Sequence, residues 1–219
     1  MPVDNDAIVK AVSGLSLQGN EDGLIPAFSL YLTRHFANYY NRVSYAYLHH
    51  AERKGAETAR IARAALVEAG HTCAFNTFGG IMMSQEWEAV VAPMIQSRED
   101  WVRGIVGVVN ALGWGRWSVE GLEAGKRLEV SIANSYESTG YLRDYAKRPE
   151  GGVCFLATGG VAGIMNLLYF GDITTRPSLN EEYYAKLFGG HGHFAAEEVE
   201  CRAHGAEKCR FVAHPGARG

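Results

Sequence analysis

Three thiols and one carboxylate are the groups in this sequence whose types and spacing best suit metal chemistry. Cys201 and Cys209 have seven residues between them, and a turn containing Gly205 separates two alternating stretches that favour a β-hairpin. Glu198 stands three residues before Cys201, and Cys154 stands far upstream, where an apolar helical pattern begins. Thiolates hold zinc tetrahedrally, and a carboxylate can complete the set. These four residues are therefore a candidate metal site.

Spacing alone leaves two other interpretations of the cysteines open. They can be buried thiols that pack as small apolar groups, or a redox pair. The chain has 4 cysteines in 219 residues and no Cys-x-x-Cys pair, which is ordinary for a protein of the reducing cytoplasm. The cysteine count therefore does not decide between these interpretations.

Two stretches around these residues resemble a known domain. Residues 198–211 read Glu-x-x-Cys-x-Ala-x-Gly-x-x-x-Cys-Arg-Phe, and residues 154–163 read Cys-Phe-Leu-Ala-Thr-Gly-Gly-Val-Ala-Gly. Both resemble the 4-vinyl reductase domain, which occurs in standalone hydrocarbon-binding proteins and as the sensor of phenol-responsive transcription activators. The resemblance is most specific in the final hairpin.

This resemblance implies an α+β fold, in which an antiparallel sheet of about four strands packs against helices and follows an N-terminal helical extension. It also implies a hydrophobic small-molecule ligand, aromatic or tetrapyrrole-like, and a homodimer. By the same resemblance the metal is a structural zinc ion, Zn2+, with the ligands Cys154, Glu198, Cys201 and Cys209. Three thiolates and a carboxylate leave no open position for substrate, as in structural zinc sites.

The candidate ligand pocket lies between the small-residue helix that follows Cys154, the sheet and an aromatic helical pattern from Pro26 towards Lys54. Rings at helical spacing in that pattern favour either a core or dimer-interface face or a ligand cavity. The run Asn134-Ser135-Tyr136-Glu137 resembles a pocket-lining segment of the phenol sensors. The candidate ligand-binding residues are His35, Tyr39, Asn134, Tyr136, Phe155 and His193.

An alternative interpretation is a metal-dependent enzyme, or an accessory factor, of tetrapyrrole or aromatic metabolism. Residues 172–194 are an insertion relative to the family pattern, and they add His191 and His193. Either this pair or His49 and His50 can bind a second ion, because imidazole is a common metal ligand. A Gly-x-Gly-x-x-Gly after a strand is absent from the sequence, which argues against a Rossmann-type dinucleotide site.

A second place for catalysis is the cluster of His71, Cys73 and Asn76. A thiol becomes reactive when a base or a positive charge lies next to it. If the protein is an enzyme, we expect its nucleophile here, although a lone cysteine outside the family motif is more often a core thiol.

Periodicity and turn signals define the expected elements. We predict a helix from Pro26 towards Lys54, a second over 56–69 that ends at Gly70, and a loop-like segment over 71–83. Ser84 and Ser97 open two further helices. A strand hairpin follows over 115–122 and 127–134, and then a small-residue helix over 154–170. Residues 1–80 are expected to form a helical N-terminal part and residues 81–219 the 4-vinyl-reductase-like domain, together as one continuous globular unit.

Composition limits the partners and the location. The net charge of −3 comes from mixed acids and bases without a basic stripe, so nucleic acid is not an expected partner. We also expect no membrane span, because the apolar runs are shorter than a bilayer requires. Residues 1–6 do not resemble a signal peptide, so the expected location is cytoplasmic.

Overall fold

The computed structural model describes residues 3–15 and 17–216, and its fold class is α+β, as predicted. Residues 1–2, 16 and 217–219, which fall in the predicted ranges 1–80 and 81–219, lie outside the described residues. A four-stranded antiparallel sheet has the order β3-β4-β6-β5, and a two-stranded sheet pairs β1 with β2. The strands are β1 Ile25–Ala27, β2 Leu30–Leu32, β3 Trp117–Glu123, β4 Arg127–Ile132, β5 Phe194–Glu200 and β6 Cys209–Pro215.

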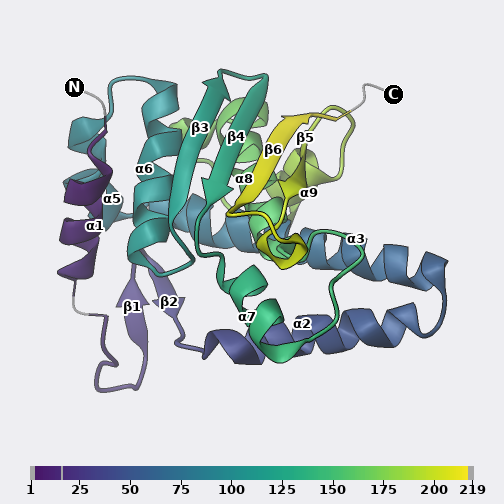
Figure 1. Cartoon of the computed structure of the whole chain (residues 1–219). Coiled ribbons are helices and arrows are strands. Elements are labelled where there is room, and N and C mark those ends of the chain that lie inside the picture. Colours follow the sequence, from purple (N-terminus) through teal and green to yellow (C-terminus); the bar gives the residue numbers. More distant parts are fainter. Residues whose placement is uncertain (1–2, 16, 217–219) are drawn as a thin grey trace.

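The helices pack mainly on one face of the four-stranded sheet (Figure 1). Helix α8 packs against β5 and β6, α3 packs along α8, and α6 packs against β3. Helix α1 lies on α6, while α2 and α7 lie together beneath the sheet. The α-helices are α1 Asn5–Ser13, α2 Ala37–Glu52, α3 Ala56–Cys73, α4 Gly79–Met82, α5 Gln85–Val90, α6 Arg98–Ala111, α7 Tyr136–Asp144, α8 Phe155–Met165 and α9 Glu181–Phe188.

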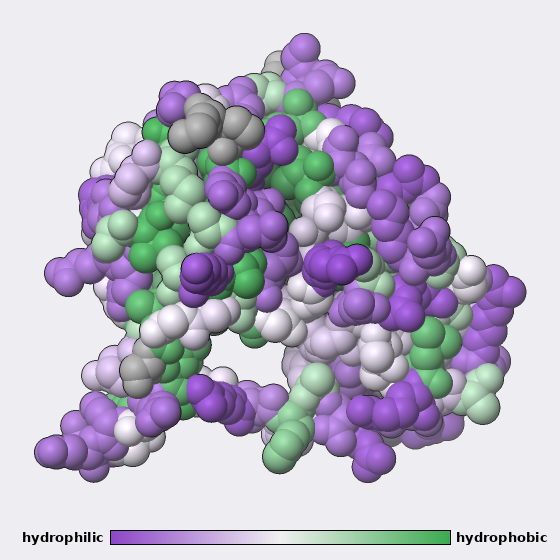
Figure 2. Space-filling model, turned by 60° about the vertical axis from the view of Figure 1, so that its left-hand side comes forward, coloured by the Kyte–Doolittle hydropathy of each residue, from purple (hydrophilic) through white to green (hydrophobic). Residues whose placement is uncertain are grey.

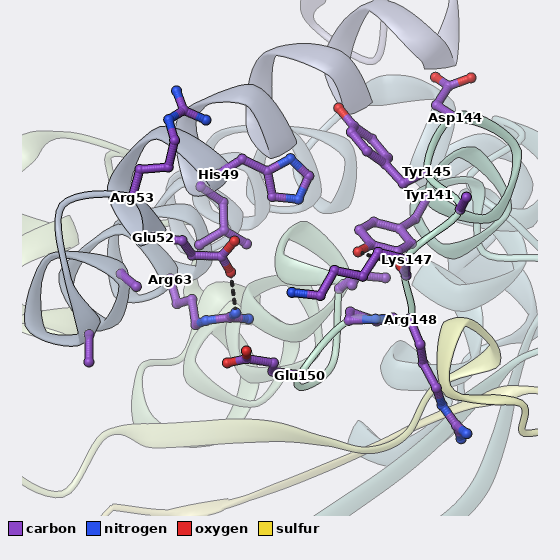
Figure 3. A pocket seen from close by; sticks show the side chains of 16 residues that line it. His49, Glu52, Arg53, Arg63, Tyr141, Asp144, Tyr145, Lys147, Arg148 and Glu150 are labelled. Carbon is purple, nitrogen blue, oxygen red and sulfur yellow. Dashed lines mark hydrogen bonds and ion pairs between the residues drawn. The ribbon is translucent and has the colours of Figure 1, made fainter.

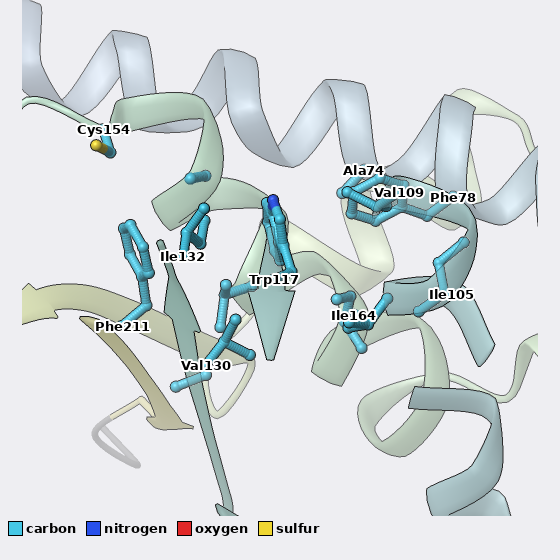
Figure 4. Close-up of a cluster of buried hydrophobic side chains, with 14 of the residues drawn as sticks. Ala74, Phe78, Ile105, Val109, Trp117, Val130, Ile132, Cys154, Ile164 and Phe211 are labelled. Atoms are coloured by element: carbon cyan, nitrogen blue, oxygen red, sulfur yellow. The ribbon is translucent and has the colours of Figure 1, made fainter. Parts of the chain in front are cut away.

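The four-stranded sheet has one packed face and one wet face, as the alternation of its first hairpin predicts. On the packed face Trp117, Ile132 and Phe211 are fully or almost fully buried and lie against the helices (Figure 4). On the other face ion pairs cross between strands, including Glu129 with Arg210 at 3.3 Å. The packed face is therefore where buried chemistry can be assembled.

Helices α3 and α8 cross at two glycines. A Cβ atom on Gly159 would lie 2.6 Å from the Cα of Gly70, and a Cβ on Gly70 would lie 2.7 Å from the carbonyl oxygen of Leu156. The backbones thus approach closely, which only glycine permits. The prediction that Gly70 ends its helix is wrong, because Gly70 is the contact point of a helix that continues to Cys73.

Residues 71–83 are helical rather than a loop, which corrects a second prediction. Helix α3 continues into a π-helical turn, Ala74–Phe78, and then into α4. Ala74, Phe75 and Phe78 are buried in the core, so tertiary packing stabilises a segment of modest helix propensity. Gly79 and Gly80 make room for side chains such as Leu30, which would contact a Cβ on Gly80 at 2.9 Å.

The predicted start of the next helix at Pro26 is also wrong, because the helix α2 begins only at Ala37. Residues 25–32 form the β1–β2 hairpin, whose turn residues Phe28 and Ser29 have φ angles of 55° and 57°. Two positive φ angles are typical of a tight hairpin turn, usually built with Asn-Gly. Here the Phe28 side chain is buried and its amide donates to the Glu86 carboxylate at 3.0 Å, which holds the turn without glycine.

The face of α2 that points away from the body carries large apolar side chains. Phe36 is 86% exposed and Tyr39 62% exposed, and Val43 and Tyr47 continue the same stripe. In Figure 2 an opening separates the lower arm, formed by the β1–β2 hairpin and the start of α2, from the rest of the molecule. Within the described residues, no helix combines the length and apolar character needed to cross a bilayer.

Candidate metal centre

The four residues predicted to bind metal come together in the structure. Cys154 immediately precedes α8, Cys201 follows β5, Cys209 begins β6, and Glu198 lies on β5. One potential ligand atom from each of the four lies within 4.8 Å of the others. The three cysteines are buried and Glu198 is half-buried. This cluster can therefore hold a metal ion.

Strand register explains why Glu198 points inward from an otherwise acidic strand. Glu198 pairs with Phe211, and side chains of paired residues share a face of the sheet, so the carboxylate lies on the packed face. A bulge at Val199 then shifts the register, so that Glu200 pairs with Arg210 on the wet face. A short helical turn and Gly205, with φ of 95°, reverse the chain towards Cys209.

Hydroxyl and amide groups surround the sulfur atoms. The Cys154 and Cys209 sulfurs are 3.6 Å apart. The Ser135 hydroxyl lies 3.3 Å from the Cys154 sulfur, and the Ser138 hydroxyl 3.4 Å from the Cys209 sulfur. The Arg202 amide also donates to the Cys209 sulfur at 3.4 Å. Donors around a thiolate fix its orientation and stabilise its charge, as outer-sphere groups do in metal sites.

The electrostatics of the cluster fit a cation at its centre. Burial, and next the neighbouring Cys201, raise the pKa of Glu198 to about 8, and burial raises the pKa of Cys154. Hydrogen bonds from Cys154 and Cys201 lower the pKa of Cys209 to about 4. Cys154 and Glu198 therefore resist ionisation beside an ionised Cys209, and a divalent cation would favour the charged form of all of them.

The Glu198 carboxylate has one oxygen free for such a cation. Its Oε2 accepts from the Cys154 amide at 3.0 Å, whereas its buried Oε1 has no hydrogen-bond partner among the described residues. A buried acceptor without a partner is costly, and a bound ion would satisfy it. A cavity of about 400 Å³ reaches Glu198 and Cys201 and offers an entry path.

Glu137 is a functional candidate to which the sequence assigned no role. Its buried carboxylate accepts from the amides of Leu156 and Ala157, both at 3.0 Å, at the N-terminus of α8. Burial raises its pKa from 4.5 to about 8, although these amides favour the charged form. The carboxylate holds the helix that begins beside Cys154.

The six candidate ligand residues lie in different environments. Phe155 is buried, and Tyr136 is partly buried with its ring against Tyr40 and Trp114. The others lie away from this interior. His35 and Tyr39 are exposed and stack on each other at 5.6 Å, Asn134 is exposed, and His193 bonds to the Gly190 carbonyl before β5.

An aromatic cluster, defined as Tyr40, Phe78, Trp114, Trp117 and Tyr136, brings together rings from α2, the π-helical turn, the start of β3 and α7 beside α8. Ring centroids along Tyr40, Tyr136, Trp114 and Phe78 are 5.9, 6.5 and 5.6 Å apart. Phe78 and Trp117 both lie within 3.7 Å of a Cβ built on Gly160. Four surface cavities, of about 770, 400, 380 and 300 Å³, lie elsewhere.

Two polar atoms of the aromatic cluster are buried without partners. The Tyr40 hydroxyl and the Trp117 indole nitrogen make no hydrogen bond within the described part of the chain. Tyrosine and tryptophan usually find a partner when buried. These two groups are therefore available to a polar atom of a small molecule.

Neither predicted histidine pair belongs to a cluster of three or more potential metal ligands in the described part of the chain. His49 packs on Tyr145 with centroids 4.8 Å apart, and His50 lies 3.4 Å from an Arg53 nitrogen. Within residues 3–15 and 17–216, the Cys154 cluster is the one place where three or more His, Cys, Asp or Glu side chains converge closely enough for a metal ion.

The three residues of the His71 cluster also have separate partners. His71 contacts Glu68 at 3.2 Å, the Asn76 amide donates to the Thr72 carbonyl, and Cys73 lies 3.7 Å from the Thr77 hydroxyl. Burial raises the pKa of Cys73, which disfavours the reactive thiolate.

Comparison with known proteins gives a similarity of fold. No family model matches the sequence, and no curated protein matches it. Among solved structures, the chain is similar to the crystal structure of the phenol-responsive sensory domain of the transcription activator PoxR with phenol. The TM-score is 0.62 at 14% sequence identity, over 94% of this chain and 89% of that chain. The chain therefore shares the fold of that sensory domain along nearly its whole length.

Proposed function

We propose that this protein is a small-molecule-binding domain of the 4-vinyl reductase type whose final hairpin is fixed by a structural zinc ion. The observation that carries the proposal is the convergence of Cys154, Glu198, Cys201 and Cys209 within 4.8 Å, with the free oxygen of Glu198 among them. Zinc, when bound, would cross-link the start of α8 to both arms of the β5–β6 hairpin. Because all four positions come from side chains, the site has a structural rather than a catalytic composition.

The proposed ligand site is the aromatic cluster. Its rings offer apolar contact, while the Tyr40 hydroxyl and the Trp117 nitrogen offer hydrogen bonds. The similar sensory domain of PoxR was solved with phenol, a ligand of this chemical kind. The rings of the aromatic cluster fill it, which favours a small aromatic molecule with a hydroxyl over a tetrapyrrole, since a ligand must displace or reorient rings to enter.

Calorimetric titration with phenol tests the ligand site. We expect saturable binding to the wild-type protein and roughly tenfold weaker binding to Tyr40→Phe, which loses one hydrogen bond and retains the ring. Tyr39→Phe, on the exposed side of the same helix, is the matched control and should bind like wild type. Absence of phenol binding at millimolar concentration, or equal binding by both variants, contradicts the proposed site.

Native mass spectrometry with elemental analysis tests the metal. We expect one zinc per chain in the wild-type protein and its loss in Cys201→Ala, while Cys73→Ala retains it because Cys73 lies outside the cluster. A wild-type protein that refolds without metal and does not bind added zinc would contradict this part of the proposal.

We also propose that the exposed stripe of α2 pairs with a second copy of the chain. Phe36, Tyr39, Val43 and Tyr47 recur at helical spacing, and contiguous apolar patches of this kind mark interfaces. A stripe on one helix can meet its own copy around a two-fold axis. Sedimentation of the wild-type chain should give a dimer that Val43→Glu dissociates, and a monomer at tens of micromolar would refute this interface.

A further inference from the structure

A further cavity lies outside both the candidate metal centre and the aromatic cluster. It has a volume of about 770 Å³ and lies between α2, the start of α3 and the segment 144–153 (Figure 3). Leu48 and Val153 in its lining are buried, whereas Lys147 and Glu150 are exposed. The cavity is thus a groove with an apolar floor and a charged rim, of a size typical for small-molecule sites.

One wall of the groove is aromatic. The rings of Tyr141 and Tyr145 stack at 5.1 Å, and His49 lies edge-on against Tyr145 at 4.8 Å. Tyr141 is buried and anchored by its hydroxyl, which donates to the Lys147 carbonyl at 3.1 Å. Tyr145 and His49 are half-buried and line the groove. A flat apolar group can therefore pack against a wall that is already ordered.

The charges around the groove favour an anion. The carboxylates that line it are Glu52, Asp144 and Glu150, and the cationic side chains that line it are Arg53, Arg63, Lys147 and Arg148. Asp144 is bound by Arg42 and Arg143 from outside the groove, and Glu52 is bound by Arg63 at 2.8 Å. A concave surface with excess positive charge concentrates anions.

Lys147 is the cation placed to meet such an anion. Figure 3 shows its side chain reaching from the Tyr141 side into the groove, towards Glu52 and Arg63. Its ammonium group is in no ion pair among the described residues. Arg148, by contrast, points away and donates to the His204 carbonyl.

We propose that this groove binds a small aromatic anion, a carboxylate or sulfonate whose ring packs on Tyr145 and His49 and whose charge pairs with Lys147. The site is separate from the aromatic cluster and does not depend on the proposed function. It gives the chain a second small-molecule site of opposite character, open and charge-selective where the first is closed and apolar.

Fluorescence titration with two probes of the same ring skeleton tests the proposal. The anionic probe is 8-anilinonaphthalene-1-sulfonate, and the neutral one, N-phenyl-1-naphthylamine, lacks the sulfonate. We expect Lys147→Met to weaken binding of the sulfonate about fivefold to tenfold and to leave the neutral probe nearly unchanged. Tyr145→Leu should weaken both probes.

Lys186→Met, an exposed lysine on α9, is the matched control and should bind both probes like wild type. Added salt should reduce the difference in sulfonate affinity between Lys147→Met and wild type, because the contact between Lys147 and the sulfonate is solvent-exposed. Equal sulfonate affinity in Lys147→Met and wild type, or equal loss of both probes, overturns the site. Lys147 is exposed and we expect its variant to fold, so the Lys147 comparison decides the question even if Tyr145→Leu is destabilised.

Discussion

The candidate metal centre and the exposed side of α2 differ in how well the sequence predicted the surroundings of their side chains. At the metal centre, side chains 44 to 55 residues apart in the chain meet in a buried space, and each sulfur or oxygen has defined neighbours. Along α2, Tyr39 is exposed, whereas Tyr45, six positions later, is buried. The cysteine and glutamate motif thus predicted which side chains meet. The aromatic residues of α2, by contrast, did not show which of them are buried and which are exposed.

Loss of the proposed metal ion should lower the thermal stability more than any other change considered below. Ligand binding to the folded state alone stabilises by about 4 kcal/mol when the ligand is at a thousand times its Kd. For a chain of this length that corresponds to roughly 8–16 °C in Tm. We therefore expect Cys201→Ala, or chelation of the wild-type protein, to lower Tm by about 10 °C in a calorimetric scan. Cys73→Ala is the control, and equal melting of chelated and untreated protein would show that the centre is not a clamp.

The helix crossing that places Cys154 should be the next most sensitive feature. Gly159→Ala gains helix propensity of about 1 kcal/mol, but the new Cβ would meet the Gly70 backbone at 2.6 Å. Overpacking of this kind typically costs about 1–3 kcal/mol, so we expect a net loss of up to about 2 kcal/mol and a Tm lower by up to roughly 8 °C. Gly151→Ala is the control, because its Cβ would meet Arg63 only at 3.9 Å. A more stable Gly159→Ala protein would mean that α3 and α8 are farther apart.

Glu137 should make stability depend on pH. Its pKa is raised by burial from 4.5 to about 8 in the folded protein, so the folded state holds this proton more tightly than the unfolded chain. The resulting stability is fully present below pH 4.5 and is lost as the pH rises through about 8. In EDTA, the Tm of the wild-type protein should therefore fall relative to the Tm of Glu137→Gln as the pH is raised from 5 to 9. A constant difference would indicate that Glu137 is ionised throughout.

The smallest effect is expected on the exposed side of α2. Tyr39→Ala, measured where the chain is monomeric, should change the free energy of unfolding by less than about 0.5 kcal/mol. Tyr45→Ala, six residues later, should cost about 3–5 kcal/mol in urea unfolding, since its ring is buried and its hydroxyl donates to two carbonyls. Similar losses in both variants would show that the contrast between exposed and buried aromatic residues is mistaken.

Much of the architecture followed from local signals. The capping box at Ser97 and Asp100, the strand hairpin after Gly115 and the small-residue helix after Cys154 all lie where the sequence predicts them. The errors occurred where a long-range contact replaces a local signal. The β1–β2 turn depends on Glu86 rather than on glycine, and the segment 71–83 is helical because its side chains are buried.

The sequence by itself determined the chemistry of the candidate centre: the soft sulfur ligands, the added carboxylate and the hairpin that carries three of the four groups. The ligand types and the hairpin depend on residue type and on residues only a few positions apart in the sequence, so they can be recognised before the fold is known. Only the tertiary structure decided that Cys154 joins them, that Glu137 and two serines support them, and that Lys147 faces a groove. Those outcomes depend on how the backbones of α3 and α8 approach each other and on the register of β5 with β6, and both are set by packing between distant parts of the chain.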